Sequence, residues 1–338
     1  MRIGILTFHG AHNYGAILQC YALQEYCRSL GHEVEVINHI IPQMASIYEP
    51  MPRQRIKQAL HNPLLAAKIL IKGLLQYRKR KARYDAFNGF IGEKLRIVSV
   101  NTINTNPYNV IFVGSDQVWN TEITCGYDSY YWGTFKRPSK TKLVSYAASM
   151  YDVWPECENE KVACLLKNFN MISVREDKVL ERIHEIAPNL NPIKVVDPAW
   201  LLSKEQWKEI AGKDKISKSY LLLFQVEPLK KAELVAQELA QKNNLEIVYL
   251  SATADRINSP SVVASSPSDF ISLFMNASFI VCTSFHGTVF SLIFDKPFKF
   301  VGTGTSRDAR VRNLLDNIDN NKETILLSKQ YIEKAILG

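Results

Sequence analysis

The sequence predicts an α/β fold of two Rossmann-like domains with a cleft between them. Short apolar, β-branched runs alternate with helical patterns along the chain, which is typical of parallel sheets covered by helices. A length of 338 residues suits two domains. Asp197-Pro198 interrupts the alternation. We therefore expect an N-terminal domain over residues 1–200, a connecting region, and a C-terminal domain over residues 219–338.

Each element follows from the period of its apolar residues, taken in chain order. In the first half these periods predict a strand Arg2–Leu6, a helix Tyr14–Ser29, strands Glu33–Ile37, Asn109–Val113 and Lys142–Tyr146, a helix Glu158–Phe169, a strand Met171–Val174, a helix Asp177–Ala187 and a strand Lys194–Val196. In the second half they predict strands Tyr220–Val226, Leu245–Leu250, Ser278–Cys282 and Phe298–Val301, with helices Lys230–Asn243, Ser268–Asn276, one from His286, Asp308–Asn317 and Lys329–Leu337.

The composition is that of an ordinary globular protein, with 46% hydrophobic and 22% charged residues, and it excludes disorder or a coiled coil as a description of the whole chain. No apolar run approaches the ~18 residues that span a bilayer, and the first residues read as a strand rather than a signal peptide. We therefore expect a cytoplasmic protein. The six cysteines form no C-x-x-C pair, so we expect no thiolate metal site and no disulfide framework.

The net charge of +8 is concentrated in one segment. Residues 51–84, within a helical insertion at 51–95, hold ten basic residues and no acidic one. Leu60, Leu64, Ala67, Ile71 and Leu74 follow a helical spacing there. Two interpretations stay open: a helix packed on its own domain with a solvated charged face, or peripheral contact with the anionic inner face of a membrane. No nucleic-acid motif appears, so no nucleic acid is expected.

Ligands of such sheets lie beyond the carboxyl ends of the strands, and five loops qualify. In the first, residues 7–16, Asn13 can cap a helix while Gly10 and Gly15 let backbone N–H groups approach an anion. The alternative there is a tight turn. In the second, Ser115, Gln117 and Trp119 can bind and stack on a sugar, with Asp116 as a base. The alternative is that Asp116 only caps the next helix.

The remaining loops carry cations and a histidine. Arg175 ends an apolar strand and can bind a phosphate or carboxylate, or it can simply pair with Glu176 or Asp177. His286, with Ser284, lies at a strand-to-helix turn suited to acid–base work. The last loop predicts a phosphate-binding turn or a mobile surface loop, and its residues are Gly302, Gly304, Arg307, Arg310 and Arg312.

Taken together and in order, several short motifs resemble the polysaccharide pyruvyl transferase family. They are N-Y-G-A-I-L-Q-x-x-A-L (Asn13 to Leu23), G-S-D-Q-x-W (Gly114 to Trp119), S-Y-A-A-S (Ser145 to Ser149), S-x-R-E (Ser173 to Glu176), Asp197-Pro198 and S-F-H-G (Ser284 to Gly287). The resemblance implies a fold similar to the two-domain GT-B glycosyltransferases. It also implies transfer of a pyruvyl group from phosphoenolpyruvate to a sugar of a cell-surface polysaccharide precursor, forming a cyclic ketal.

Carried over by position, the resemblance gives Arg175 the role of holding the donor and His286 that of general acid/base. Family members often carry Arg two residues before that His, where this chain has Ser284, so we expect Arg307, Arg310 or Arg312 to replace the cation. Donor contacts are also expected from Asn13, Gly15, Gly302 and Gly304, and acceptor contacts from Tyr14, Ser115, Gln117 and Trp119.

The expected partners are phosphoenolpyruvate and a sugar, free or lipid-linked, with no cofactor and no metal. Two alternatives remain. One is a glycosyltransferase that uses a nucleotide sugar, since the predicted architecture would serve it equally. The other is a non-catalytic glycan- or membrane-binding protein anchored by the basic segment.

Overall fold

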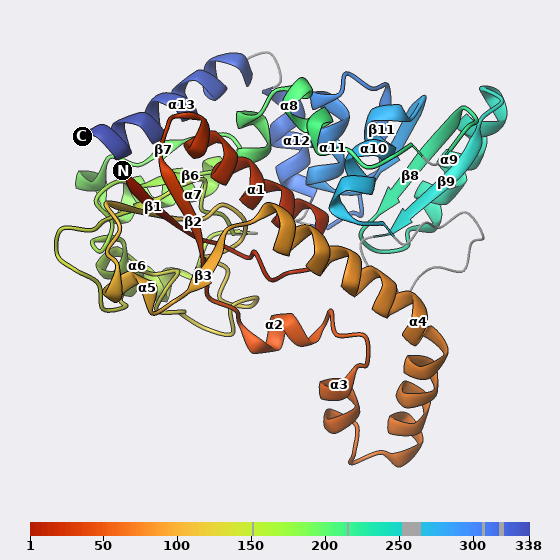
Figure 1. Cartoon of the computed structure of the whole chain (residues 1–338), viewed down its shortest axis with the longest axis horizontal. Coiled ribbons are helices and arrows are strands. Elements are labelled where there is room, and N and C mark those ends of the chain that lie inside the picture. The colour runs from red at the N-terminus through yellow and green to blue at the C-terminus, as the bar shows by residue number, and fades with distance from the viewer. Residues whose placement is uncertain (151, 215, 252–264, 306–307, 318–320) are drawn as a thin grey trace.

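The computed structural model describes residues 1–338 except 151, 215, 252–264, 306–307 and 318–320. It contains two separate, wholly parallel sheets (Figure 1), as the sequence predicts. The first sheet has the order β3 (Ile97–Ser99), β2 (Glu33–Asn38), β1 (Arg2–Leu6), β4 (Val110–Val113) and β5 (Lys142–Ser145). The α/β class with two parallel sheets is confirmed.

A short pair of strands continues the first sheet beyond β5. It consists of β6 (Ser173–Val174) and β7 (Ile193–Lys194). Single bridges join Val144 to Met171 and Ala148 to Val174, so the chain around Arg175 lies at the carboxyl end of this extended sheet. Several short helices connect the strands from β3 to β7. In chain order they are α5 (Thr102–Thr105), the 3₁₀ turn η1 (Glu156–Glu158), α6 (Asn159–Leu166), α7 (Asp177–Ile186) and the 3₁₀ turn η2 (Pro188–Leu190).

The second sheet has the order β11 (Phe298–Phe300), β10 (Phe279–Cys282), β8 (Tyr220–Gln225) and β9 (Glu246–Ser251). Every residue of β8 is buried, because a central parallel strand is covered by helices on both faces. This explains why the strand reads as one continuous apolar run. The accompanying helices are α9 (Lys230–Lys242), α10 (Pro267–Asn276), α11 (Phe285–Ile293) and α12 (Asp308–Asp316).

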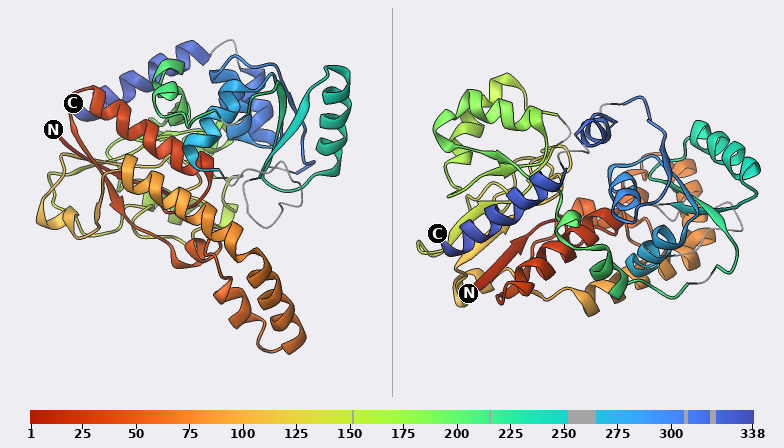
Figure 2. Two further views of the ribbon diagram at one scale, coloured as in Figure 1. Left: turned by 45° about the vertical axis from the view of Figure 1, so that its right-hand side comes forward. Right: turned by 90° about the horizontal axis from the view of Figure 1, so that it is seen from above.

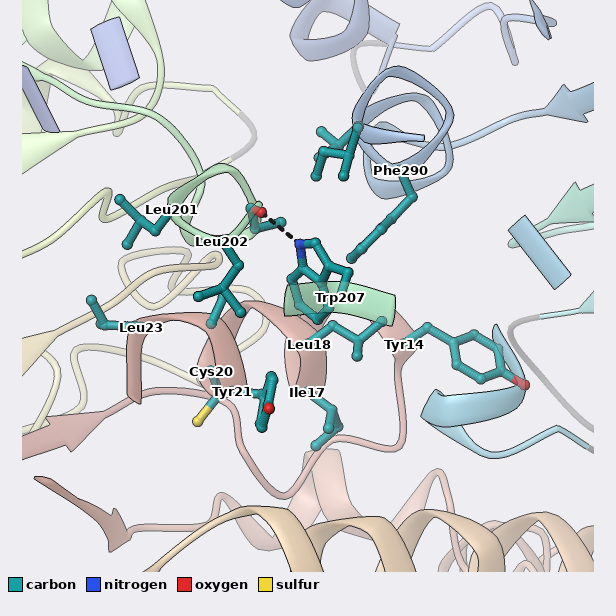
Figure 3. Close-up of a cluster of buried hydrophobic side chains, with 14 of the residues drawn as sticks. Tyr14, Ile17, Leu18, Cys20, Tyr21, Leu23, Leu201, Leu202, Trp207 and Phe290 are labelled. Atoms are coloured by element: carbon teal, nitrogen blue, oxygen red, sulfur yellow. Dashed lines mark hydrogen bonds between the residues drawn. The ribbon is translucent and has the colours of Figure 1, made fainter. Parts of the chain in front are cut away.

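Helix α1 (Tyr14–Ser29) lies between the two sheets, and most of its residues are buried. Figure 3 shows its side chains packed against η3 (Pro198–Leu201), α8 (Lys204–Glu209) and α11. Trp207 is central to this contact: its Nε1 donates to the Ala199 carbonyl at 3.1 Å, and its ring lies edge-on to Phe290 at 5.1 Å. One hydrophobic cluster therefore includes strands of both sheets.

The C-terminal helix α13 (Asn321–Leu337) packs against the first sheet, although α12 before it accompanies the second. Tyr331 Oη donates to the Ser145 carbonyl at 3.0 Å, and Ser328 Oγ accepts from the Val196 backbone at 2.9 Å. The expected boundaries group these residues with the second domain, whereas their hydrogen bonds run to strands and loops of the first. The chain thus passes between the two halves of the molecule twice.

The basic insertion forms α2 (Pro42–Ser46), α3 (Arg53–Gln58) and the 32-residue α4 (Pro63–Lys94). Asn62 caps α4 by accepting from the Leu65 backbone at 3.1 Å. The second half of α4 packs on the body of the molecule through Phe87 and Phe90, while α3 and the first half of α4 project away from it (Figures 1 and 2). Within the described part of the chain, no helix combines the length and apolar character needed to cross a membrane.

Candidate functional site

The Asp197 carboxylate joins the two residues that the sequence singles out most strongly. Arg175 Nη1 donates to Asp197 Oδ2 at 2.5 Å, and His286 Nε2 faces the same oxygen at 3.4 Å. Arg175 follows β6, whereas His286 is the second residue of α11, beside the second sheet. The arginine and the histidine, far apart in sequence, therefore meet at one carboxylate between the two halves of the molecule.

The remaining contacts of this cluster fix its orientation. Arg175 Nη2 donates to Ser149 Oγ at 2.9 Å and its Nε to Glu176 Oε1 at 3.3 Å, so pairing with Glu176 is real but is only part of its environment. Asp197 Oδ1 accepts from the Ala199 backbone at 3.0 Å. A guanidinium has five N–H donors, and these bonds use three of them. Arg175 can thus still bind an anion.

Electrostatics hold this cluster charged although it is buried. Burial alone raises the pKa of the Asp197 carboxyl, but the facing His286 and Arg175 outweigh burial and keep that pKa well below its usual range. Burial likewise lowers the pKa of Arg175, yet the carboxylates of Glu176, Asp197 and Asp116 raise it overall. A permanent guanidinium and a permanent carboxylate therefore flank the His286 imidazole.

Gly15 leaves the space that the His286 ring occupies. A Cβ atom built on Gly15 would lie 2.0 Å from His286 Nδ1, far inside van der Waals contact. Asn13 caps the same helix by accepting from the Gly15 backbone at 3.0 Å. The sequence predicts donor contacts for both residues. Their observed roles are local: Asn13 starts α1, and Gly15 backs the imidazole.

A cavity of about 780 Å³ lies beside the cluster. Arg175 and Asp197 line it from the first half of the chain, and Phe285, Arg310 and Arg312 from the second. The Arg175 and Arg310 guanidinium carbons lie 4.7 and 5.7 Å from the centre of the Phe285 ring. Two guanidinium groups from different elements therefore converge on one wall, which suits a small ligand with more than one negative charge.

Position 284 carries a serine and supplies no cation. Its Oγ caps α11 by accepting from the Gly287 backbone at 3.1 Å, so the side chain that stands where the family often has Arg serves the helix. Arg310 and Arg312 reach the cavity instead. Arg307, the third expected replacement, lies outside the described residues.

The loop expected to bind a phosphate directs its backbone N–H groups to a carboxylate of the chain itself, and the donor contacts of Gly302 and Gly304 stay a prediction. The backbone N–H groups of Thr303 and Gly304 donate to the two carboxylate oxygens of Asp308 at 2.9 and 2.8 Å. A Cβ on Gly302 would lie 2.7 Å from Asp308 Oδ2. The chain's own carboxylate occupies the place that the sequence suggested for a phosphate.

The loop after β4 is also more buried than expected. Trp119 is fully buried, stacks on Trp132 at 5.1 Å and donates from Nε1 to the Tyr131 carbonyl at 3.0 Å. These contacts make it a core residue here, and its stacking on a sugar stays a prediction that they do not favour. Ser115 is buried too and donates to the Ala147 carbonyl at 3.1 Å. Asp116 and Gln117 keep partial exposure, and they remain the candidates of this loop.

Asp116 caps its own loop and also contributes charge to the cluster. Its Oδ1 accepts from the Gln117 backbone at 2.9 Å, and its carboxylate acts on the Arg175 guanidinium. The left-handed φ of 72° at Asp116 directs the chain into this turn. The alternative that Asp116 only caps the next helix is wrong, because the structure describes turns and no helix between β4 and β5. Its role as a base near the site stays a prediction.

Tyr14 lies between the two halves rather than in the cavity. Its Oη donates to the Ser265 carbonyl at 2.9 Å and accepts from Arg83 Nη1 at 2.5 Å, and its ring stacks on Phe270 at 4.8 Å. The side chain is fully buried. In the described structure Tyr14 is thus a packing residue between the halves, and its contact with an acceptor stays a prediction.

Asp197 is the functional residue that sequence reasoning passed over. Asp197-Pro198 is one of the motifs that resemble the family, but the resemblance assigns no role to its carboxylate. The signal was present, because Asp197 follows the strand expected at 194–196 and so obeys the same strand-end rule as Arg175 and His286. Across the residues the structure describes, no group of three or more His, Cys, Asp or Glu side chains could hold a metal ion.

Comparison with known proteins gives one strong match. A family model described as polysaccharide pyruvyl transferase matches residues 13–304, which include Arg175, Asp197 and His286. No curated protein matches the chain.

Among solved structures, the chain is similar to two UDP-N-acetylglucosamine 2-epimerases. The enzyme from Methanocaldococcus jannaschii has a TM-score of 0.46 and 11% identity, with 100% of this chain and 93% of that chain covered. The one from Neisseria meningitidis has a TM-score of 0.43 and 12% identity, with 100% of both chains covered. A Streptomyces sp. SF2575 glycosyltransferase has a TM-score of 0.38 and 12% identity, covering 99% and 95%. All these scores are low, so the fold assignment depends on the two parallel sheets themselves.

Proposed function

The chain belongs to the polysaccharide pyruvyl transferase family, and from that premise we propose that it transfers a pyruvyl group from phosphoenolpyruvate to a sugar hydroxyl pair as a cyclic ketal. The family makes it a transferase that modifies polysaccharides and so takes a sugar acceptor. The donor and the ketal are our proposal. One observation carries it: Arg175 and His286 share the Asp197 carboxylate beside a cavity lined by further arginines.

The donor carries a phosphate and a carboxylate on a three-carbon enol, and its pocket therefore needs several cations. Arg175 and Arg310 supply two guanidinium groups around Phe285, and Arg312 adds a third on the cavity wall. They replace the cation that Ser284 does not provide. A dianionic enol bound here would lie beside Arg175 and Asp197, which line the cavity. His286 faces Asp197 from α11 and is not among the residues that line the cavity, so the proposed reaction requires its ring to turn toward the donor.

In the proposed reaction, protonated His286 gives its proton to the methylene carbon of the enol. Positive character then develops at the carbon that bears the phosphate, and a sugar hydroxyl adds there and gives its proton to the now neutral His286. Phosphate departs with the bonding electrons of its C–O bond. The neighbouring hydroxyl adds to the same carbon and closes the ketal, and its proton leaves with the phosphate. Asp197 stabilises the imidazolium, and Asp116 orients the acceptor. No cofactor or metal is needed for these steps.

The test is phosphate release from phosphoenolpyruvate against a panel of aryl and lipid-linked sugars, with mass spectrometry to identify the ketal. We expect His286→Asn to lower turnover by about two orders of magnitude or more while the unfolding midpoint stays near that of the wild type. His184→Asn, an exposed histidine on α7, is the matched control and should keep full turnover.

Two results would contradict the proposal. One is undiminished phosphate release by the His286→Asn variant. The other is thermal stabilisation by a nucleotide sugar but not by phosphoenolpyruvate, which would favour the glycosyltransferase alternative.

A further inference from the structure

The projecting end of the insertion exposes large apolar side chains. We call residues 53–79, which comprise α3 and the first half of α4, the distal hairpin. Leu64 and Leu75 are 85% and 81% exposed, and Leu60, Ile71 and Leu74 are more than half exposed. Positions 64, 71 and 75 recur at helical spacing, so they lie on one face of α4. Isolated exposed leucines need no explanation, but a continuous stripe does.

The opposite face of α4 is already used. Gly73 is buried there, and a Cβ on it would lie 3.0 Å from Pro52 and 3.2 Å from Met51. Ala59, in the turn between the helices, is also buried. The apolar stripe is thus not the packing surface of the hairpin but its exposed face, and the hairpin as a whole projects from the body of the molecule (Figure 2).

Exposed cations flank this stripe. Lys57, Lys68, Lys72 and Arg78 are all exposed. The ten basic residues of positions 51–84 exceed the net charge of +8 of the whole chain, so the remainder is slightly acidic. Leucines on an outer face with lysines and arginines beside them are the pattern by which a helix lies in the interface of an anionic bilayer.

Three kinds of partner could cover this surface: a second copy of the hairpin, a nucleic acid or an anionic bilayer. The charges of the hairpin distinguish between them. A second copy of the hairpin would bring a second set of cations, from a segment that contains no acidic residue, against the first, and like charges oppose that contact. A nucleic acid would match the cations but gives the leucines nothing to bury against. We propose that the distal hairpin docks the protein on the surface of an anionic lipid bilayer, with the α4 stripe in the apolar boundary and the cations at the headgroups.

The docking surface is connected to the site by α4 itself. Further along the helix, Arg83 is buried and donates to the Tyr14 hydroxyl and to the His12 carbonyl at 3.0 Å. The loop that holds these residues continues into Gly15, which backs His286. The hairpin is therefore held rigidly on the body of the protein by α4, and docking would fix the orientation of the whole molecule relative to the bilayer.

The experiment is flotation of the full chain with vesicles, without donor or acceptor, so that its outcome is independent of the proposed reaction. Vesicles of equal parts phosphatidylglycerol and phosphatidylcholine should bind the protein, and phosphatidylcholine alone should not. Binding should weaken as salt is added. Combined Lys68→Gln, Lys72→Gln and Arg78→Gln should weaken it about a hundredfold. Combined Leu64→Gln, Ile71→Gln and Leu75→Gln should weaken it about tenfold or more.

Two matched controls place glutamine at exposed positions outside the hairpin. The control for the leucine variant changes Leu234, Leu326 and Leu337, and the control for the cation variant changes Lys140, Lys242 and Lys322. Neither control should alter vesicle binding. Equal binding to phosphatidylcholine vesicles, equal weakening by the controls, or no vesicle binding by the wild type would each overturn the proposal. So would concentration-dependent dimerisation that the leucine variant abolishes, because the stripe would then be an interface between copies.

Discussion

At position 15 the absence of one methyl group decides where the proposed acid–base imidazole lies. The ring of His286 occupies the space beside Gly15 that any other side chain would fill. The same ring faces a carboxylate that is fixed by Arg175 and by the Ala199 backbone. Position and charge environment of the histidine are therefore set by residues far from it in sequence.

We expect Gly15→Ala to lower turnover by about two orders of magnitude, because displacement of a catalytic group by about 1 Å costs this much. The free energy of unfolding should change by less than about 1 kcal/mol, since alanine is favourable in a helix and the partly exposed ring can move. Steady-state kinetics and urea unfolding measure the two quantities.

Gly89→Ala is the control for this change. Gly89 also lies in a helix, but a Cβ there meets nothing within 4 Å. This variant should gain about 0.5–1 kcal/mol of stability and keep its turnover. If both glycine variants retained full activity, the contact between Gly15 and His286 would have no role in catalysis.

Ligands of parallel sheets lie beyond the carboxyl ends of the strands. This rule identifies residues of the site where a side chain extends beyond the strand end, and it fails where the side chain packs into the core instead. Arg175, His286 and Asp197 all follow apolar strands and meet. Trp119 follows β4 in the same way, yet it packs on Trp132 inside the core. The local sequence is equally suggestive in both cases, because the direction of the indole is set by residues more distant along the chain.

At the scale of elements, the loop between β11 and α12 shows how a chain satisfies its own backbone donors. Asp308 accepts from Thr303 and Gly304 and also from the Thr303 hydroxyl at 2.9 Å. Burial raises the pKa of this carboxyl, but these hydrogen bonds lower it below its usual value overall. Sequence alone cannot tell such an internal acceptor from a bound anion, since both need the same small, glycine-rich turn.

Asp308→Ala should lower the free energy of unfolding by about 1–3 kcal/mol, because it leaves backbone N–H groups without their charged acceptor. Asp316→Ala, an exposed aspartate at the other end of α12, should change stability by less than about 0.5 kcal/mol. Urea unfolding measures both. Equal effects of the two changes would mean that the hydrogen bonds of Asp308 to this loop contribute nothing to the free energy of unfolding.

Most elements could be predicted because parallel strands read as apolar runs and helices as periodic ones. The strand expected at 194–196 is found at Ile193–Lys194, since its pairing with β6 is brief. What the sequence could not show is which half of the molecule a helix accompanies. The hydroxyls of Tyr331 and Ser328 bind the first half, and nothing in the spacing of α13 indicates that choice.

For the molecule as a whole, residues 12–14 form the junction where the first sheet, the insertion and the second half meet. His12 stacks on Phe87 at 5.2 Å, and its Nε2 lies 3.2 Å from Asn88 Oδ1 on α4. Burial, assisted by Arg83, lowers the pKa of His12 from 6.5 to about 4. The folded protein thus prefers the neutral ring, and its stability is complete only above the pKa of the unfolded chain.

Acidification should therefore weaken the protein between about pH 6.5 and pH 4, as the folded state resists a proton that the unfolded chain accepts. The His12 contribution lost from about pH 7.5 to pH 5 is on the order of 2 kcal/mol. His12→Gln should flatten the pH dependence of the unfolding free energy by that amount, while His9, whose pKa burial also lowers, keeps its own contribution. An unchanged slope in the variant would exclude His12 as the cause.

The return of α13 to the first sheet has a mechanical consequence. Two covalent connections join the halves, one leading into β8 and one between α12 and α13. With two connections and with one hydrophobic cluster that includes strands of both sheets, the halves cannot come apart without exposing this shared core. Arg310 and Arg312, which lie on α12 before the second connection, are therefore held beside the first half for as long as that core is intact.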